Sequence, residues 1–165
     1  GDSCEPKDTM GILSRCRDSR LEIIQKLKKK NPTSTIHNLG EGADISDLNA
    51  SEIELYKGTL RNRDLLKRAL PELEKEESNH ELIGQLLSDH HQVLRDVLQV
   101  STPKIEAMMD AASNTGALGG KINGSGGGGC MFAYAPNNPE HVAEAIEKAG
   151  GKAYIVQKDE GTRIN

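Results

Sequence analysis

The sequence predicts an α+β fold, in which an antiparallel sheet carries helices on one face and the N-terminal two thirds are rich in helix. Residues 1–115 place apolar side chains at the three- and four-residue spacing of amphipathic helices. From residue 116 the pattern changes to short apolar runs bounded by turn residues, which is typical of strands. Because strands joined by a short loop pair antiparallel, we expect residues 116–165 in the order strand, glycine-rich loop, strand, helix, strand.

Length and composition limit the function classes. A chain of 165 residues fits a single domain, 1–165, around one core. A net charge of -4 and a pI of about 5.8 provide no basic surface for nucleic acid or an anionic membrane. No apolar run is long enough for a secretion signal or a membrane span. Cys4, Cys16 and Cys130 lie far apart without metal-binding spacing. We therefore expect a cytoplasmic protein with no metal site of its own.

Two long helices are expected before residue 80. The first follows Asp8 as its N-cap and ends at the basic run "KKKNP". The second begins with Ser51 and Glu54 as a capping box. Pro71 should kink or end this second helix, because proline has no amide hydrogen and its ring clashes with the preceding turn.

Two further helices follow. The third is expected from Glu81 to Leu98, with His90 on its apolar stripe and His91 as its exposed neighbour. We interpret His90 as a core residue, since no metal-binding partner lies at the spacing that a site would need. The fourth helix begins with Thr102 as N-cap and Pro103 at its first position.

Other residues of these two helices have structural interpretations. Gly116 is expected to cap the C-terminus of the fourth helix. Arg95 and Asp96 are interpreted as a structural pair that reaches across to another helix, and the neighbouring methionines, Met108 and Met109, as core residues.

The last fifty residues contain the expected strands. "GGKI" and "CMFAYA" flank the glycine-rich loop, "NNPEHVAEAIEKAGG" is a capped helix, and "KAYIVQ" is a third strand. Eight of the 17 glycines fall between Gly116 and Gly129. Since glycine loses the most conformational freedom on folding, such a cluster indicates a close approach of the backbone or else a flexible linker. The apolar flanks favour a fixed loop.

The glycine-rich loop does not match three known phosphate-binding loops. Gly124, Gly126 and Gly129 satisfy the GxGxxG spacing, but a strand rather than a helix follows them. A Walker A loop ending at Lys121 would need glycine at 115 and serine or threonine at 122, where Thr115 and Ile122 stand. The lysine and DFG motifs of protein kinases are also missing. Free main-chain amides can still form a nest for phosphate, or pack beneath another loop that binds it.

Three separated segments resemble one known family. "GGKINGSGGGGCMFAYAP" resembles the third conserved motif of the GHMP kinases, most closely in its galactokinase form. "HHQVLRDVLQVSTPKIEAMM" resembles a galactokinase helix that runs through "VSTP" into the next helix, and "RNRDLL" stands where the family has an arginine-rich helix. The resemblance extends from about Ser51 to Val156.

The resemblance implies a place in a larger enzyme. It implies a ferredoxin-like C-terminal lobe of a two-lobe kinase, and the opening "GDSCEPKD" without methionine suggests a piece of a longer protein. In the family the catalytic aspartate, the sugar-orienting residues and the main phosphate loop belong to the N-terminal lobe, so no catalytic residue is assigned here. A role in supporting the phosphate site is implied for the loop, whose residues are Gly124, Ser125, Gly126, Gly127, Gly128 and Gly129.

The implied activity is that of an ATP-dependent sugar kinase. It transfers the γ-phosphate of ATP to the anomeric hydroxyl of galactose or a related sugar, with ATP and Mg²⁺ required by the full-length enzyme. We expect this chain alone to be inactive and to bind neither group tightly. Two alternatives remain: a non-catalytic sugar-sensing or regulatory module on the same fold, and a free-standing domain that binds a small molecule.

The sequence departs from the galactokinase pattern in the glycine-rich loop and at the expected sugar contact. Gly127 stands where many galactokinases carry a bulky aromatic residue, and the first tyrosine is Tyr56, later than the sugar-contacting tyrosine of many galactokinases. The sugar therefore stays open. The candidates to replace that contact are Asp2, Glu5, Lys7 and Asp8.

The N-terminal residues "GDS" are expected to be the end of a strand, since the family implies that this lobe opens with one. About three clear strands should then follow Gly116. A sheet that lacks one member has an exposed edge, which favours self-association. The alternatives are an edge that is solvated or covered by the N-terminal residues.

Overall fold

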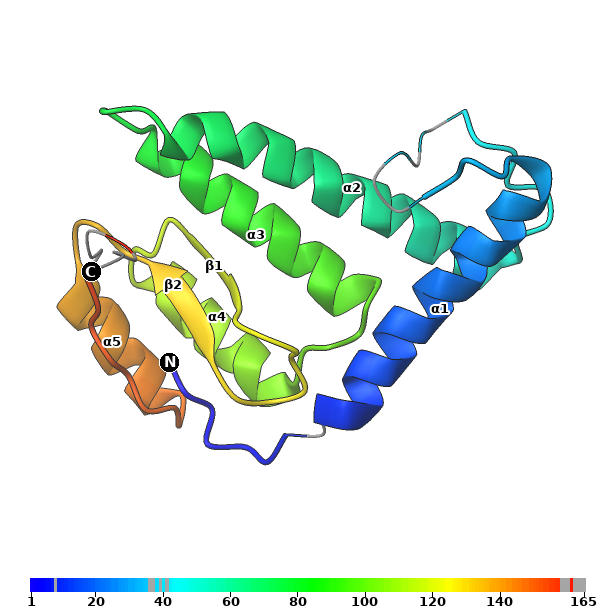
Figure 1. Ribbon diagram of the computed structural model, residues 1–165. Helices are drawn as coiled ribbons and strands as arrows, with labels where there is room; N and C mark the ends of the chain where they lie inside the picture. The colour runs from blue at the N-terminus through cyan, green and yellow to red at the C-terminus, as the bar shows by residue number, and fades with distance from the viewer. Residues whose placement is uncertain (8, 36–37, 39, 41, 158–160, 162–165) are drawn as a thin grey trace, which may run out of the picture.

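The computed structural model describes residues 1–7, 9–35, 38, 40, 42–157 and 161 of the chain. The described elements are, in chain order, α1 (Thr9–Lys30), α2 (Ala50–Leu73), α3 (His80–Asp96), α4 (Pro103–Asn114), β1 (Gly119–Ile122), β2 (Met131–Tyr134) and α5 (Pro139–Lys148). Figure 1 shows the three long helices α1, α2 and α3 on one side of the molecule. The hairpin β1–β2 lies with α4 and α5 on the other side. The predicted α+β class is confirmed, and no described helix is long and apolar enough to cross a membrane.

The predicted capping box of α2 is shifted by two residues. The side chain of Asn49 accepts a hydrogen bond from the Glu52 amide at 3.0 Å, and the Glu52 carboxylate accepts one from the Asn49 amide at 2.9 Å. The prediction of Ser51 and Glu54 was wrong because asparagine serves as well as serine at this position and stands directly before the first helical residue. Pro71 lies inside α2, which ends two residues later at Leu73.

The N-terminus of α4 follows the prediction. Thr102 is its N-cap, with Oγ1 accepting from the Ile105 amide at 3.3 Å, and Pro103 is the first helical residue. Gly116 follows the C-cap residue Thr115 and has a φ of 106°, a conformation that suits glycine at a helix end. Asp8, the predicted N-cap of the first helix, lies outside the described residues.

The sheet contains two strands rather than the three expected after Gly116. β1 and β2 pair antiparallel, with Gly119 opposite Tyr134 and Ile122 opposite Met131. The expected strand "KAYIVQ" is not formed, and only Lys152 bridges, antiparallel, to Asp2. A strand needs a continuous neighbour, and residues 1–3 are too few to pair with the rest of that segment. Asp2 pairs with both Cys130 and Lys152 through isolated antiparallel bridges, and the interpretation of "GDS" as the end of a strand stays a prediction.

The main core lies between the hairpin and the two helices α4 and α5. Figure 1 shows α4 behind the hairpin and α5 beside it. The buried members of this core are Val100, Ile105, Met108, Ala112, Ile122, Met131, Val142 and Ile146. The core position predicted for Met108 is therefore confirmed, and Met109 packs against the same cluster while partly buried. A second cluster joins α1 to α2 and contains Ile23, Leu27, Leu48, Tyr56 and Leu60.

Helix α3 approaches β1 closely. A Cβ added to Gly84 of α3 would overlap the main chain of Leu118, and one added to Gly119 of β1 would overlap the carbonyl oxygen of Gly84. Two glycines facing each other thus allow the helix and the strand to touch through their backbones. This contact brings the side chains of α3 to the outer edge of β1.

Candidate functional site

The glycine-rich loop joins β1 to β2 and has a backbone that demands glycine. The Asn123 amide donates to the Cys130 carbonyl at 2.9 Å, which closes the base of the loop. Five glycines between these residues have positive φ angles: Gly124 at 83°, Gly126 at 80°, Gly127 at 70°, Gly128 at 101° and Gly129 at 74°. Residues with a side chain rarely adopt this region. From the sequence, Gly126 or Gly128 is expected to adopt backbone angles closed to other residues, and both do.

The loop is packed against two other segments of the chain. The Gly127 amide donates to the Val100 carbonyl at 2.7 Å. A Cβ on Gly126 would overlap that same carbonyl oxygen, and a Cβ on Gly128 would lie 3.1 Å from the carbonyl oxygen of Pro6. The glycines therefore allow the backbone of the loop to pack closely on Val100 and Pro6 of the same chain. A flexible linker would not make these contacts.

One lysine lies over the loop. A Cβ built on Gly129 would stand 3.0 Å from Lys7 Cε and 3.1 Å from Lys7 Nζ, and one built on Gly124 would stand 3.4 Å from the same Nζ. The ammonium group is therefore beside both ends of the loop. Within the part of the chain that the structure describes, Ser125 Oγ is buried and has no hydrogen-bond partner. A cation and an unpaired hydroxyl are groups that suit an anionic oxygen such as that of a phosphate.

The other candidate contacts near the N-terminus have structural partners. Glu5 Oε2 accepts a hydrogen bond from Thr102 Oγ1 at 2.5 Å, which ties the N-terminal segment to the start of α4. Asp2 Oδ1 accepts from the Cys4 amide at 2.9 Å. Among the four candidates to replace the sugar contact, Lys7 brings a charged group to the loop and Glu5 approaches Gly128, while Asp8 lies outside the described residues.

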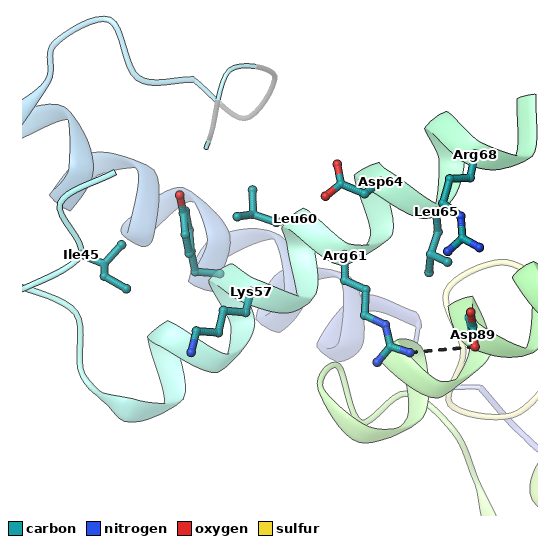
Figure 2. A pocket seen from close by; sticks show the side chains of 9 residues that line it. Ile45, Lys57, Leu60, Arg61, Asp64, Leu65, Arg68 and Asp89 are labelled. Carbon is teal, nitrogen blue, oxygen red and sulfur yellow. Dashed lines mark ion pairs between the residues drawn. The ribbon is translucent and has the colours of Figure 1, made fainter. Parts of the chain in front are cut away.

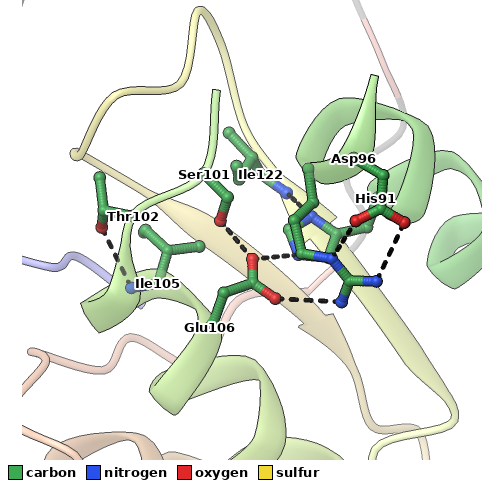
Figure 3. Close-up of polar contacts among 8 residues, drawn as sticks. His91, Asp96, Ser101, Thr102, Ile105, Glu106 and Ile122 are labelled. Carbon is green, nitrogen blue, oxygen red and sulfur yellow. Dashed lines mark hydrogen bonds and ion pairs between the residues drawn. The ribbon is translucent and has the colours of Figure 1, made fainter. Parts of the chain in front are cut away.

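A polar network holds the strand that leads into the loop (Figure 3). The Ile122 amide donates to His91 Nδ1 at 3.4 Å, and His91 Nε2 lies 2.9 Å from Glu106 Oε1. Since Nδ1 accepts, Nε2 carries the proton and donates to the carboxylate. Ser101 Oγ donates to the same Glu106 oxygen. Both nitrogens of this imidazole are used, so the network fastens β1 to α3 and α4.

The exposure of the two histidines differs from the prediction. His91, expected to be exposed, is 6% exposed, and His90 is partly buried. The prediction for His91 was wrong because β1 lies along α3, and that contact cannot be seen in the periodicity of the helix alone. The burial of His91 therefore becomes apparent only when the packing of α3 on β1 is known.

The predicted Arg95–Asp96 pair also reaches another helix. Arg95 Nε lies 2.7 Å from Asp96 Oδ1, and Arg95 Nη1 donates to Glu106 Oε2 of α4 at 3.3 Å. The hydrogen bonds to Asp96 and then to Glu106 raise the pKa of the Arg95 guanidinium. Glu106 therefore receives hydrogen bonds on both carboxylate oxygens, as Figure 3 shows.

A separate cavity of about 620 Å³ lies against α2 (Figure 2). Its lining includes the apolar residues Ile45 and Leu60 and the cations Lys57 and Arg68. Arg61, from the arginine-rich segment "RNRDLL", donates to Gln92 Oε1 at 2.9 Å and approaches Asp89 at 4.0 Å. Both partners lie on α3, so Arg61 links the two helices.

Comparison with known proteins extends these observations. The family model "GHMP kinases C terminal" matches residues 65–154. The mevalonate kinase of Thermococcus onnurineus is 49% identical over 83 residues, 50% of this chain and 25% of that protein. The mevalonate kinase of Pyrococcus furiosus is 47% identical over 96 residues, 58% of this chain and 28% of that protein. The galactokinase of Clostridium perfringens is 31% identical over 138 residues, 74% of this chain and 35% of that protein.

A solved structure shares the fold. The crystal structure of Lactococcus lactis galactokinase complexed with galactose superposes with a TM-score of 0.69 and 18% sequence identity, over 90% of this chain and 41% of that one. This chain spans between 25% and 35% of the length of the three relatives named above.

Proposed function

The chain belongs to the GHMP kinase family, and from this premise we propose that it is the C-terminal lobe of a two-lobe, ATP-dependent kinase. In this proposal residues 1–165 form one domain, with a mainly helical part (1–115) and the part that carries the glycine-rich loop (116–165). The other lobe supplies the general base and the main contacts to the acceptor.

The observation that carries the proposal is the backbone of the loop together with Lys7 and Ser125. Phosphoryl transfer depends on positioning and on stabilising charge, which main-chain amides and a lysine can provide. The residues proposed to support the phosphate site are Gly124, Ser125, Gly126, Gly127, Gly128 and Gly129. Lys7 lies beside Gly124 and Gly129, so its ammonium group would face a bound phosphoryl oxygen.

ATP would supply the phosphoryl group, and Mg²⁺ would neutralise the charge that develops on it. The unpaired Ser125 Oγ and the Lys7 ammonium fit a phosphate, which is an acceptor of hydrogen bonds. Within the described ranges, no group of three or more acidic, histidine or cysteine side chains could hold a metal ion. We therefore assign no residue of this chain as a ligand of Mg²⁺.

The first candidate for the acceptor is galactose or a related sugar, phosphorylated on its anomeric hydroxyl. The similarity to the galactokinase of Clostridium perfringens supports it, because it extends further along this chain than the similarity to the two mevalonate kinases named above. Mevalonate is the second candidate, favoured by the higher sequence identity of those mevalonate kinases. The third candidate function is a sensing module, which binds the sugar without turnover. Assays must distinguish this module from a kinase.

Kinetics of one variant beside the loop and one within it, both in the whole protein, test the proposed site. Lys7→Met keeps the aliphatic stem that packs on Gly129 but removes the charge, and Ser125→Ala removes only the hydroxyl. We expect Lys7→Met to lower kcat/KM for ATP by about tenfold or more, which corresponds to about 1.4 kcal/mol for one charged hydrogen bond. Met10→Ala, at an exposed residue of α1, is the matched control. Unchanged kinetics of both Lys7→Met and Ser125→Ala would contradict the site.

A further inference from the structure

Two main-chain amides attach the glycine-rich loop to groups outside the hairpin. The Ile122 amide, directly before the loop, donates to His91 Nδ1 at 3.4 Å. The Gly127 amide, within the loop, donates to the carbonyl oxygen of Val100 at 2.7 Å. The first acceptor comes from α3 and the second from the segment that joins α3 to α4. The position of the loop therefore depends on where these two acceptors lie.

One carboxylate oxygen connects the two acceptors. Glu106 Oε1 of α4 accepts a hydrogen bond from His91 Nε2 at 2.9 Å and another from Ser101 Oγ, as Figure 3 shows. Ser101 is the residue after Val100, so its hydroxyl lies one residue from the carbonyl that holds the loop. The contacts form a ring that runs through the loop: Ile122, His91, Glu106, Ser101, Val100 and Gly127.

The loop cannot keep its place if the Val100 carbonyl moves. A Cβ added to Gly126 would stand 2.4 Å from this carbonyl oxygen, so the backbone of the loop lies directly on it. Arg15 of α1 holds the preceding turn, because its Nη2 donates to the carbonyls of residues 98 and 99, each at 3.2 Å. Since this contact does not involve Ser101, loss of the Ser101 hydroxyl should loosen the loop without unfolding the turn.

An ionised carboxylate suits all three neighbours of Glu106. Oε1 accepts from two donors, and Oε2 accepts from Arg95 Nη1 at 3.3 Å. A glutamine at this position would have one acceptor oxygen and one amide nitrogen, which only donates. If that nitrogen faced Arg95, two donors would meet. If it faced His91, then Nε2 would have to accept, the proton would move to Nδ1, and the Ile122 amide would lose its acceptor. Glu106 therefore selects the histidine tautomer that holds β1.

We propose that Glu106 is a positioning residue of the phosphate site, which holds the glycine-rich loop at both attached amides, those of Ile122 and Gly127. Ser125, whose unpaired hydroxyl is proposed to face a phosphoryl oxygen, lies between these two residues. Phosphoryl transfer depends on such positioning, and a displacement of about 1 Å can cost up to about a hundredfold in rate. The inference rests on the function proposed for the loop.

Kinetics of the whole protein separate positioning from binding. A carboxylate that only positions the loop should affect the transition state more than the binding of ATP. We expect Glu106→Gln to lower kcat by about tenfold and to change KM for ATP by less than about twofold. Asp110→Asn is the matched control, since it makes the same chemical change at an exposed residue one turn further along α4. We expect its kinetics to equal those of the unsubstituted protein.

Two NMR measurements on the whole protein test the linkage without using kinase activity. Glu106→Gln should speed amide hydrogen exchange at both Ile122 and Gly127 by about tenfold, because the hydrogen bonds of both amides weaken. The nitrogen spectrum of the His91 ring should show the proton on Nε2 in the unsubstituted protein. In Glu106→Gln it should show a new population with the proton on Nδ1. Asp110→Asn should alter neither the exchange nor the ring spectrum.

Ser101→Ala removes only one hydroxyl and tests the linkage even if Glu106→Gln does not fold. We expect faster exchange at Gly127 and unchanged exchange at Ile122. Unchanged exchange at Gly127 in the folded variants would overturn the linkage, and an unchanged kcat with faster exchange would overturn the role in turnover. Absence of turnover in the unsubstituted protein would contradict the proposed function instead, while the exchange rates and the ring spectrum would still decide whether Glu106 holds the loop.

Discussion

His91 Nδ1 accepts a hydrogen bond from the main-chain amide of Ile122, so a side chain of α3 satisfies a backbone group at the outer edge of β1. Ile122 is the last residue of β1, and the glycine-rich loop begins directly after it. The other nitrogen of the same imidazole donates to Glu106 of α4. One buried histidine therefore connects two helices to the strand that positions the loop.

The first prediction concerns this histidine. His91→Phe keeps an aromatic ring but leaves the Ile122 amide without its partner and removes one of the two hydrogen bonds to Glu106 Oε1. An unsatisfied buried group costs about 1–3 kcal/mol, so we expect the free energy of unfolding to fall by about 2 kcal/mol or more. Urea unfolding measures this change. Ser88→Ala, at an exposed residue of the same helix, is the control, and equal stability of the two variants would refute the role given to His91.

The second prediction separates two glycines of the loop. Both have positive φ, but a Cβ on Gly126 would also overlap the Val100 carbonyl, whereas one on Gly124 would meet only Lys7 Nζ at 3.4 Å. We expect Gly124→Ala to cost about 1 kcal/mol from its backbone conformation. Gly126→Ala should cost at least about 1 kcal/mol more, because the loop must also move away from Val100. Thermal unfolding of both variants measures the difference, and equal costs would show that the packing on Val100 does not hold the loop.

The contact with Val100 also changes the interpretation of a larger substitution. From the sequence, Gly126→Val would be expected to lower turnover far more than stability. Because Gly126 is buried against Val100, a valine there must disturb the core as well as the loop. Gly124, which is exposed, is the better position for separating an effect on turnover from one on folding.

The third prediction concerns pH. Burial, the charge of Lys121 and the neighbouring His91 lower the pKa of His90 from its usual 6.5. The unfolded chain then binds a proton near pH 6.5 that the folded chain binds only at lower pH, so protonation favours unfolding in this range. We expect stability to fall as the pH decreases from about 7 to about 5, and the fall to be smaller in His90→Gln. Denaturant unfolding at a series of pH values measures both slopes. Parallel curves for the two proteins would be incompatible with a depressed His90 pKa.

The helices could be predicted from the sequence because their signals are local. The apolar spacing, Thr102 with Pro103, and Gly116 after the last turn each act within a few residues. The capping box was misplaced by two residues because Asn49 and Ser51 both satisfy the local rule. The local pattern therefore predicts that helix α2 forms but not the residue at which it begins.

The sheet and the site depend on distant partners and were harder to predict. The segment after Lys152 has the composition of a strand but lacks a continuous neighbour, so it forms a single bridge. His91 is buried because β1 lies against α3, and Lys7 reaches a loop that lies more than a hundred residues later in the chain. Neither contact leaves a periodic signal. The glycine cluster did predict the unusual backbone, because positive φ angles require that residue type.

The most direct test of the account measures ADP formation by the whole protein with ATP and Mg²⁺, with galactose or mevalonate as the acceptor. The proposed function predicts saturable, galactose-dependent ADP formation and a product that carries the phosphate on its anomeric oxygen. It also predicts no turnover above background for residues 1–165 alone, which serve as the control. Turnover with mevalonate but not galactose would contradict the choice of acceptor, and no turnover with either acceptor would contradict the assignment as a kinase.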